Sequence, residues 1–155
     1  MHYRSLFALS SALYATVLLT GCSAPDASKM VVGNWVLRQD SIANHLGKDS
    51  IVNSPPDEQA KTGAFYRGMT LAIRPDKTYT ILMGVPMEGA WSVAKNAITL
   101  TIVSVNGRVV PMAPSAAPQT LTGHLDTWQN HLDISMPSLS ENSHENDLGF
   151  EKSKK

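Results

Sequence analysis

The sequence predicts an all-β domain whose short antiparallel strands form an up-and-down meander and close into an eight- or nine-stranded barrel. Beyond Met30, apolar residues alternate with polar ones at a period of two, the pattern of a strand with one buried face. Turn-forming residues recur at short intervals, so that neighbouring strands are joined by hairpins. Closing the sheet removes the exposed edges of such a meander, and a two-sheet sandwich is the alternative architecture.

Residues 1–21 predict a cleaved signal peptide. Met1–Arg4 supplies a positive charge, and the apolar run Ser5–Thr20 is shorter than a membrane-spanning helix, which needs about 20 residues. Residues 19–22, L-T-G-C, resemble the lipobox of bacterial lipoproteins, in which a branched residue and two small ones precede the cysteine. The resemblance implies transfer of diacylglycerol to the Cys22 thiol, cleavage before Cys22, and acylation of the new amino group by a fatty acid such as palmitate. An ordinary secretory signal with an incidental cysteine is the alternative.

Residues 22–29 are small, polar and proline-containing, and they predict an acylated flexible tether. Ser23 follows the cysteine, whereas Asp at that position resembles the inner-membrane retention signal of enteric bacteria. In a bacterium with two membranes, the expected location is therefore the outer membrane, with the domain facing the periplasm. Cys22 is the only cysteine, so the fold contains no intramolecular disulfide.

The barrel domain, residues 30–155, is expected to begin with a strand at Val31–Arg38. The connection Gln39–Arg67 follows, and a connection of about thirty residues is usually either functional or disordered. Within it, Pro56–Tyr66 predicts one short helix, because proline is favoured in the first helical turn.

Three hairpins follow from the rule that apolar residues face apolar residues across a pair of strands. The first turns at Arg74–Thr78 with Lys77 in the left-handed conformation, the second turns at Lys95-Asn96, and the third turns at Asn106-Gly107, the strongest hairpin dipeptide in the chain. The third joins residues 103–105 to 108–110. The first two registers pair Ile73 with Tyr79, Leu71 with Ile81, Met69 with Met83, Val93 with Ile98, Trp91 with Leu100, and Gly89 with Ile102.

A fourth hairpin is expected to turn within Asp126–Gln129, and a last strand is expected near Asp147–Lys152. The register of the fourth hairpin pairs Leu125 with Asn130, Gly123 with Leu132, Leu121 with Ile134, and His124 with His131 on the polar face.

With these elements in place, the chain resembles a lipocalin-like, calycin-type barrel. The resemblance rests on Gly33-Asn34-Trp35 in the first strand, the long connection after it, and the run of hairpins, with further short matches within residues 76–101 (D-K-T-Y-T, E-G-A-W and I-T-L-T) to small bacterial lipocalin-like lipoproteins. It implies that Trp35 plugs the base of the barrel and that residues 39–67 form a lid over its mouth. The second lipocalin motif, T-D-Y, is absent. Lys152 can stand in for the arginine of the last strand that packs across the tryptophan.

One function that this barrel would support is the binding of a small hydrophobic ligand. Methionine adapts its shape and often lines apolar sites, and Met136, Met87 and Met112 add to the methionines expected inside or near strand ends. A core filled by its own side chains is the alternative, since eight-stranded barrels are often filled. The candidate lining residues are Trp35, Met69, Leu71, Ile73, Tyr79, Ile81, Met83, Trp91 and Leu100.

The second function left open is a protein-interaction or inhibitor module that acts on an envelope partner through Gln39–Arg67 or Ser138–Asp147. Both segments are long enough to carry a binding surface of their own.

The sequence gives little support for nucleic-acid binding, metal binding or catalysis. With 13 basic and 13 acidic residues, the chain has no electrostatic footprint for nucleic acid. His124 and His131 with Asp133 nearby could bind zinc or copper, but structural zinc usually has four ligands, so a solvated polar face is favoured and no metal or other cofactor is expected. His144-Glu145 begins an H-E-x-x-H motif that fails at Leu148. No G-x-S-x-G motif is present, and we expect no enzyme activity.

Overall fold

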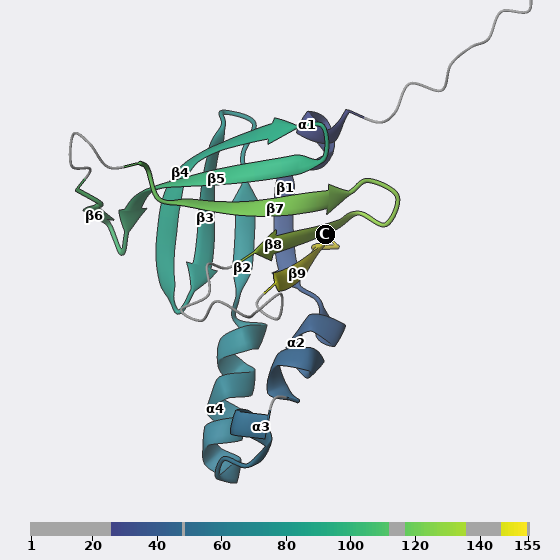
Figure 1. The fold of residues 1–155 in the computed structure, drawn as a ribbon, viewed down its shortest axis with the longest axis vertical. Helices are drawn as coiled ribbons and strands as arrows, with labels where there is room; N and C mark the ends of the chain where they lie inside the picture. The colour runs from purple at the N-terminus through teal and green to yellow at the C-terminus, as the bar shows by residue number, and fades with distance from the viewer. Residues whose placement is uncertain (1–25, 48, 112–116, 136–146, 155) are drawn as a thin grey trace, which may run out of the picture.

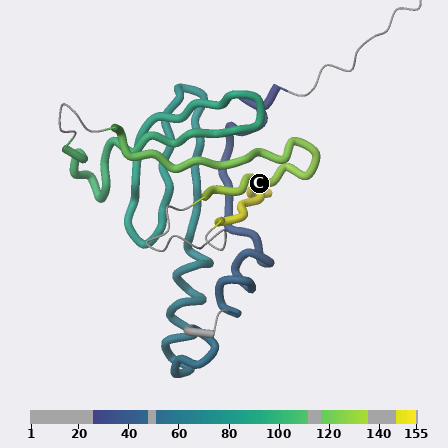
Figure 2. The backbone as a smooth tube through the Cα atoms, viewed as in Figure 1, coloured from purple at the N-terminus to yellow at the C-terminus, as the bar shows by residue number. Residues whose placement is uncertain are grey.

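The structure, a computed structural model, describes residues 26–47, 49–111, 117–135 and 147–154 (Figures 1 and 2). The signal peptide and Cys22 lie outside these residues. The described elements are, in chain order, α1 (Ala27–Met30), β1 (Gly33–Leu37), α2 (Gln39–Leu46), α3 (Asp49–Val52), α4 (Pro56–Arg67), β2 (Thr70–Ile73), β3 (Thr78–Met83), β4 (Val85–Ala94), β5 (Ala97–Val105), β6 (Arg108–Val109), β7 (Thr120–Asp126), β8 (His131–Ser135) and β9 (Asp147–Lys152).

Eight strands form a closed antiparallel barrel. They pair in the order β1-β2-β3-β4-β5-β7-β8-β9, and β9 pairs back with β1 to close the ring. The two-residue strand β6 adds to the far end of β5 as an extra hairpin. The predicted all-β meander and its closure into a barrel are therefore confirmed.

The alternating strand directions give the barrel two ends, which we call the base and the mouth. The base carries α1, the turns at residues 74–77, 95–96 and 127–130, and the end of β9. The mouth carries Gly84 between β3 and β4, the β6 hairpin, and helices α2–α4, which project away from the barrel in Figure 1. The helices of segment 39–67 project away from the barrel and do not form the lid over it that the lipocalin resemblance implies (Figure 1).

The hairpins at residues 74–77 and 95–96 have the predicted registers. In the first, Leu71 faces Ile81, and Lys77 has the expected left-handed conformation with φ of 67°. In the second, Trp91 faces Leu100, and a bulge at Glu88/Gly89 follows. The turn at Asn106-Gly107 also joins two strands as predicted.

The predicted register of the fourth hairpin is wrong by two residues. Leu125 faces Leu132 instead of Asn130, His124 faces Asp133 instead of His131, and the turn occupies residues 127–130. Asp126 causes the shift, because its Oδ1 accepts hydrogen bonds from the backbone N–H groups of Trp128 (2.8 Å) and Gln129 (3.1 Å) and so closes a longer turn. A shift of two residues leaves every side chain on its predicted face.

Helix α4 confirms the helix predicted over Pro56–Tyr66, with proline in its first turn. Two shorter helices, α2 and α3, precede it within the same connection, and α1 lies directly before β1. Segment 39–67, which we call the helical insertion, is therefore mostly helical.

The side chains that point into the barrel pack against one another. At the base, Val31 is fully buried, and its carbonyl accepts a hydrogen bond from Trp35 Nε1 at 2.8 Å. Lys152 places Nζ 5.4 Å from the centre of the Trp35 ring, as the lipocalin resemblance implies, and burial lowers its pKa. Side chains with less than 2% of their surface exposed include Trp35, Leu71, Tyr79, Ile81, Ile98, Leu100, Leu125, Leu132, Ile134 and Phe150.

Candidate interaction surface at the mouth

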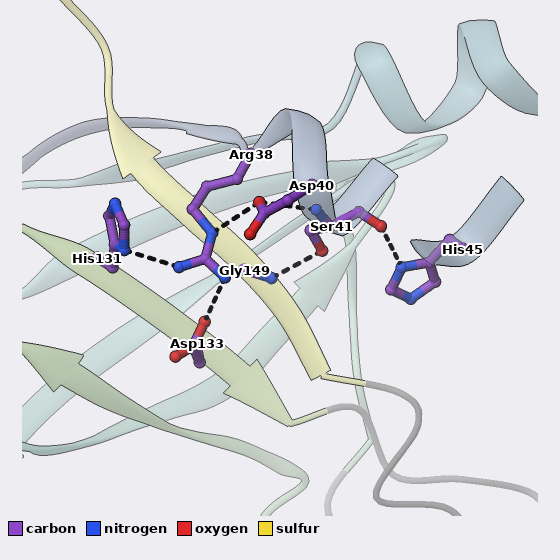
Figure 3. A network of polar contacts seen from close by, with 7 residues as sticks. All are labelled: Arg38, Asp40, Ser41, His45, His131, Asp133 and Gly149. Carbon is purple, nitrogen blue, oxygen red and sulfur yellow. Dashed lines mark hydrogen bonds and ion pairs between the residues drawn. The ribbon is translucent and has the colours of Figure 1, made fainter. Parts of the chain in front are cut away.

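The junction between β1 and α2 fastens the helical insertion to β9. Both backbone groups of Gly149 are used: its carbonyl accepts from the Arg38 N–H at 2.8 Å, and its N–H donates to Ser41 Oγ at 3.1 Å. The Arg38 guanidinium lies directly over Gly149, so that a β-carbon there would come within 2.7 Å of Arg38 Nη2. Figure 3 shows this arrangement across the yellow strand. The helical insertion is therefore fixed where it leaves the barrel.

The Arg38 side chain continues across the outer wall to β8. Its Nη1 lies 2.8 Å from His131 Nδ1, and because guanidinium groups only donate, Nδ1 must be the unprotonated acceptor (Figure 3). Arg38 also lies near two carboxylates, with Nε 3.1 Å from Asp40 and Nη2 3.7 Å from Asp133. The Nε contact is an ion pair without directed hydrogen-bond geometry. The Arg38 side chain thus links β1, α2 and β8.

The helices of the insertion are held to each other by aromatic contacts. His45, buried on α2, donates from Nδ1 to the Ser41 carbonyl at 2.7 Å, and its ring centre lies 5.0 Å from that of Tyr66 on α4. Partial burial raises the pKa of the Tyr66 hydroxyl. Phe65 meets Tyr66 edge-on at 5.6 Å and extends over Gly84 at the barrel rim. The contacts of the insertion with the barrel therefore include Gly149 and Gly84.

Most of the exposed large apolar side chains lie away from the base, on the insertion and on the strands at the mouth end. Of the seven large hydrophobic side chains that the described residues expose, only Trp128 lies at the base. The other six belong to the insertion, to the mouth ends of β3, β4 and β5, and to β6. We call these six the mouth patch: Val52, Phe65, Leu82, Val85, Val103 and Val109.

A groove of about 450 Å³ is lined by residues of β3, β4 and β5 and by Arg74. It forms at the bulge in β4, where Gly89 comes so close to Thr101 that a β-carbon would overlap the Thr101 carbonyl oxygen. Tyr79 and Gly89 form its floor, Val103 belongs to both groove and patch, and its remaining lining residues are Arg74, Thr78, Glu88, Ala90 and Ser104.

The predicted ligand-lining residues come together, but as a packed core. Eight of the nine expose at most 4% of their surface, and Met83 is half-buried against them. Side chains this well buried leave little room for solvent beside them, although Tyr79 also borders the groove of about 450 Å³. The other proposed sites, Cys22, Met112, Met136 and residues 138–146, which include His144-Glu145, lie outside the described residues.

The polar candidates on the outer wall do not form a metal site. Within the described parts of the chain, no three His, Cys, Asp or Glu side chains are placed to share a metal ion. His131 is instead bonded to Arg38, and His124 faces Asp133 across the β7–β8 pair. No helix of the described residues has the length and apolarity to cross a membrane.

Two features of this end were not predicted from the sequence. The Arg38–Gly149 contact joins residues far apart in the chain, and no local pattern indicates it. The exposure of Phe65 depends on how α4 leans over the rim. The exposure of Trp128, at the opposite end, was predictable from the sequence, because an aromatic residue inside a turn points away from the core.

Comparison with known proteins adds no assignment: no family model, no curated protein and no solved structure matches the chain. The fold and the mouth patch are therefore the basis for any statement about function.

Proposed function

We propose that this protein is a lipid-anchored protein of the bacterial envelope that binds another protein through the mouth of its barrel. In this proposal the lipobox-like sequence ending at Cys22 supplies the membrane anchor, at the base end of the domain. The barrel acts as a rigid support, and the helical insertion with the surrounding rim forms the binding surface.

The observation that carries the proposal is the segregation of exposed apolar side chains. Six of the seven exposed large apolar side chains of the described residues lie on the side away from the base; exposed apolar groups commonly mark a protein contact, and aromatic residues such as Phe65 are favoured anchors. The contacts of Arg38 and Ser41 with Gly149 support the proposal further, because they hold the helical insertion in place. A fixed surface loses less entropy on binding than a mobile one.

Binding of a small hydrophobic molecule inside the barrel is less well supported. A ligand of that kind needs an interior cavity, whereas the residues proposed to line it are packed against each other. The same packing suits a supporting domain, because a filled core resists deformation.

Site-specific photocrosslinking in living cells tests the proposal. A photoreactive amino acid is placed at position 65 or 85 in the mouth patch of the full chain, and the covalent products are identified by mass spectrometry. Matched controls carry it at Ser92 or Thr122, which are also exposed but lie on the outer wall.

We expect one discrete protein adduct from positions 65 and 85 and none from the control positions. A Phe65→Asp substitution should weaken the adduct formed from position 85 by about tenfold or more, since a central aromatic anchor commonly contributes at least 2 kcal/mol. Identical products from all four positions, or none from the mouth, would contradict the proposal.

A further inference from the structure

The base of the barrel is a firm surface made of three turns and α1. Trp91 of β4 joins the first turn, with its backbone N–H donating to the Lys77 carbonyl and its Nε1 donating to the Arg74 carbonyl, both at 2.9 Å. The N–H of Leu125 in β7 donates to the Asn96 carbonyl at 2.8 Å, which joins the second and third turns. The β7–β8 turn is therefore fixed relative to the rest of the base.

Trp128, on that turn, is the most exposed large apolar side chain of the described residues. It exposes 92% of its surface, although its own backbone is held by Asp126. A fixed turn that presents an indole to solvent is unfavourable in water, and tryptophan, like tyrosine, is enriched where protein meets the headgroup region of a bilayer. Trp35 and Trp91 are buried, so Trp128 differs from the other tryptophans of the chain.

The start of the described chain gives the base a defined distance from the anchor. Asp26 caps α1 through the Ser28 N–H at 3.0 Å, and α1 packs at the base beside the turn at residues 74–77. Cys22 precedes Asp26 by four residues, which span about 14 Å at most. An acyl anchor on Cys22 would hold α1 within that distance of the lipid surface.

We infer that the base is a membrane-docking surface and that Trp128 inserts its indole into the headgroup region of the bilayer that holds the acyl chains. The inference rests on the anchoring part of the proposed function. Lys29, Lys77 and Lys95 lie at the same end and can approach the phosphates of lipid headgroups. Asp26, Asp76 and Asp126 also lie there, so the docking rests on Trp128 and the anchor and not on an excess of positive charge. Docking at the base orients the barrel so that the mouth patch faces away from the membrane.

Fluorescence quenching by brominated lipid tests the inference on the full chain, matured and lipidated in a bacterial host. The protein is reconstituted into vesicles of phosphatidylethanolamine and phosphatidylglycerol, part of which carry bromine on the acyl chain near the headgroup. A Trp128→Ser variant provides the matched control, because the two tryptophans that it retains, Trp35 and Trp91, are buried. Mass spectrometry of the Cys22 peptide establishes lipidation independently.

The emission contributed by Trp128, which is the difference between the wild type and Trp128→Ser, should move to shorter wavelength and be largely quenched by brominated lipid. Emission that stays at the long wavelength of exposed indole, and that aqueous iodide quenches in the presence of vesicles, would overturn the inference while leaving the anchor intact. Lack of acyl mass on Cys22 would overturn the anchor and the docking with it. Crosslinking of position 128 to a protein in cells would assign the turn to a partner instead.

Discussion

The contact of Arg38 with Gly149 links the barrel wall to the helical insertion. Both backbone groups of the glycine are bonded, and the guanidinium occupies the space that a side chain would need. The contact makes the identity of residue 149 important for the orientation of the insertion as well as for the stability of the sheet.

Substituting Gly149 with alanine should therefore destabilise the protein. The new β-carbon would lie 2.7–2.9 Å from three atoms of the Arg38 side chain, which must move and lose its bond to His131. We expect the free energy of unfolding in urea to fall by about 1–3 kcal/mol. In an Arg38→Ala background the same substitution should cost much less, and an equal cost in both backgrounds would show that Arg38 is not the obstacle.

Tyr79 has a buried hydroxyl with no hydrogen-bond partner among the described residues, and burial raises its pKa to about 12. The unfolded chain loses this proton near pH 10, so unfolding becomes easier as pH rises from 10 to 12, by about 2–3 kcal/mol at most. A Tyr79→Phe variant should lack this loss, and it should be at least as stable as the wild type at neutral pH. Urea unfolding of both proteins across that pH range measures the difference, and parallel curves would contradict the assignment.

At the scale of elements, the hairpins show which strand registers can be predicted from the sequence and which cannot. The left-handed conformation of Lys77 and the turns at residues 95–96 and 106–107 were predictable, because apolar pairing and turn chemistry agreed on one register. The β7–β8 register was not, because the Asp126 side chain selects a longer turn that apolar pairing cannot distinguish from a shift of two residues. Helix α2 escaped prediction because its buried face depends on Tyr66 and Gly149, which are distant in sequence.

Asp126 should accordingly control the order of the β7–β8 turn. The N–H groups of Gln129 and Trp128 lower the pKa of its carboxyl, so its contribution to stability is present above the ordinary pKa and is lost as pH falls through the lowered value. We expect Asp126→Ala to speed hydrogen exchange at the amides of residues 128 and 129. Asp126→Asn keeps an oxygen acceptor and should largely preserve their protection, whereas equal exchange in both variants would contradict the capping role.

At the scale of the whole molecule, the closed barrel was predictable, because the strands had one apolar face each and several of them were joined to a neighbour by a hairpin. Whether the barrel is hollow was not predictable, since the pattern of inward residues such as Leu71 and Ile81 is the same in a filled core and in a lined cavity. The mouth patch depends on where the insertion settles, and that position is determined by long-range contacts.

The filled core has a direct consequence for mass measurements. Native mass spectrometry of the protein should give the mass of the chain with whatever groups are covalently attached to it, and nothing more. Added fatty acid or phospholipid should not bind inside, because the side chains around Trp35 leave no room. A discrete extra mass that disappears on denaturation would restore the ligand-binding hypothesis.

The pairing of β9 with β1 also determines the order in which the molecule can be completed. The seven other contacts of the ring join strands that follow one another in the chain and can form as it emerges, but β1 must wait for the last strand to be synthesised. Until then Trp35 lacks its cover by Lys152, and Arg38 and Ser41 lack Gly149. A chain interrupted before β9 would therefore fail to close the ring and also fail to set its helices in place. Such a product would expose apolar side chains and unpaired strand edges and would therefore be prone to aggregate.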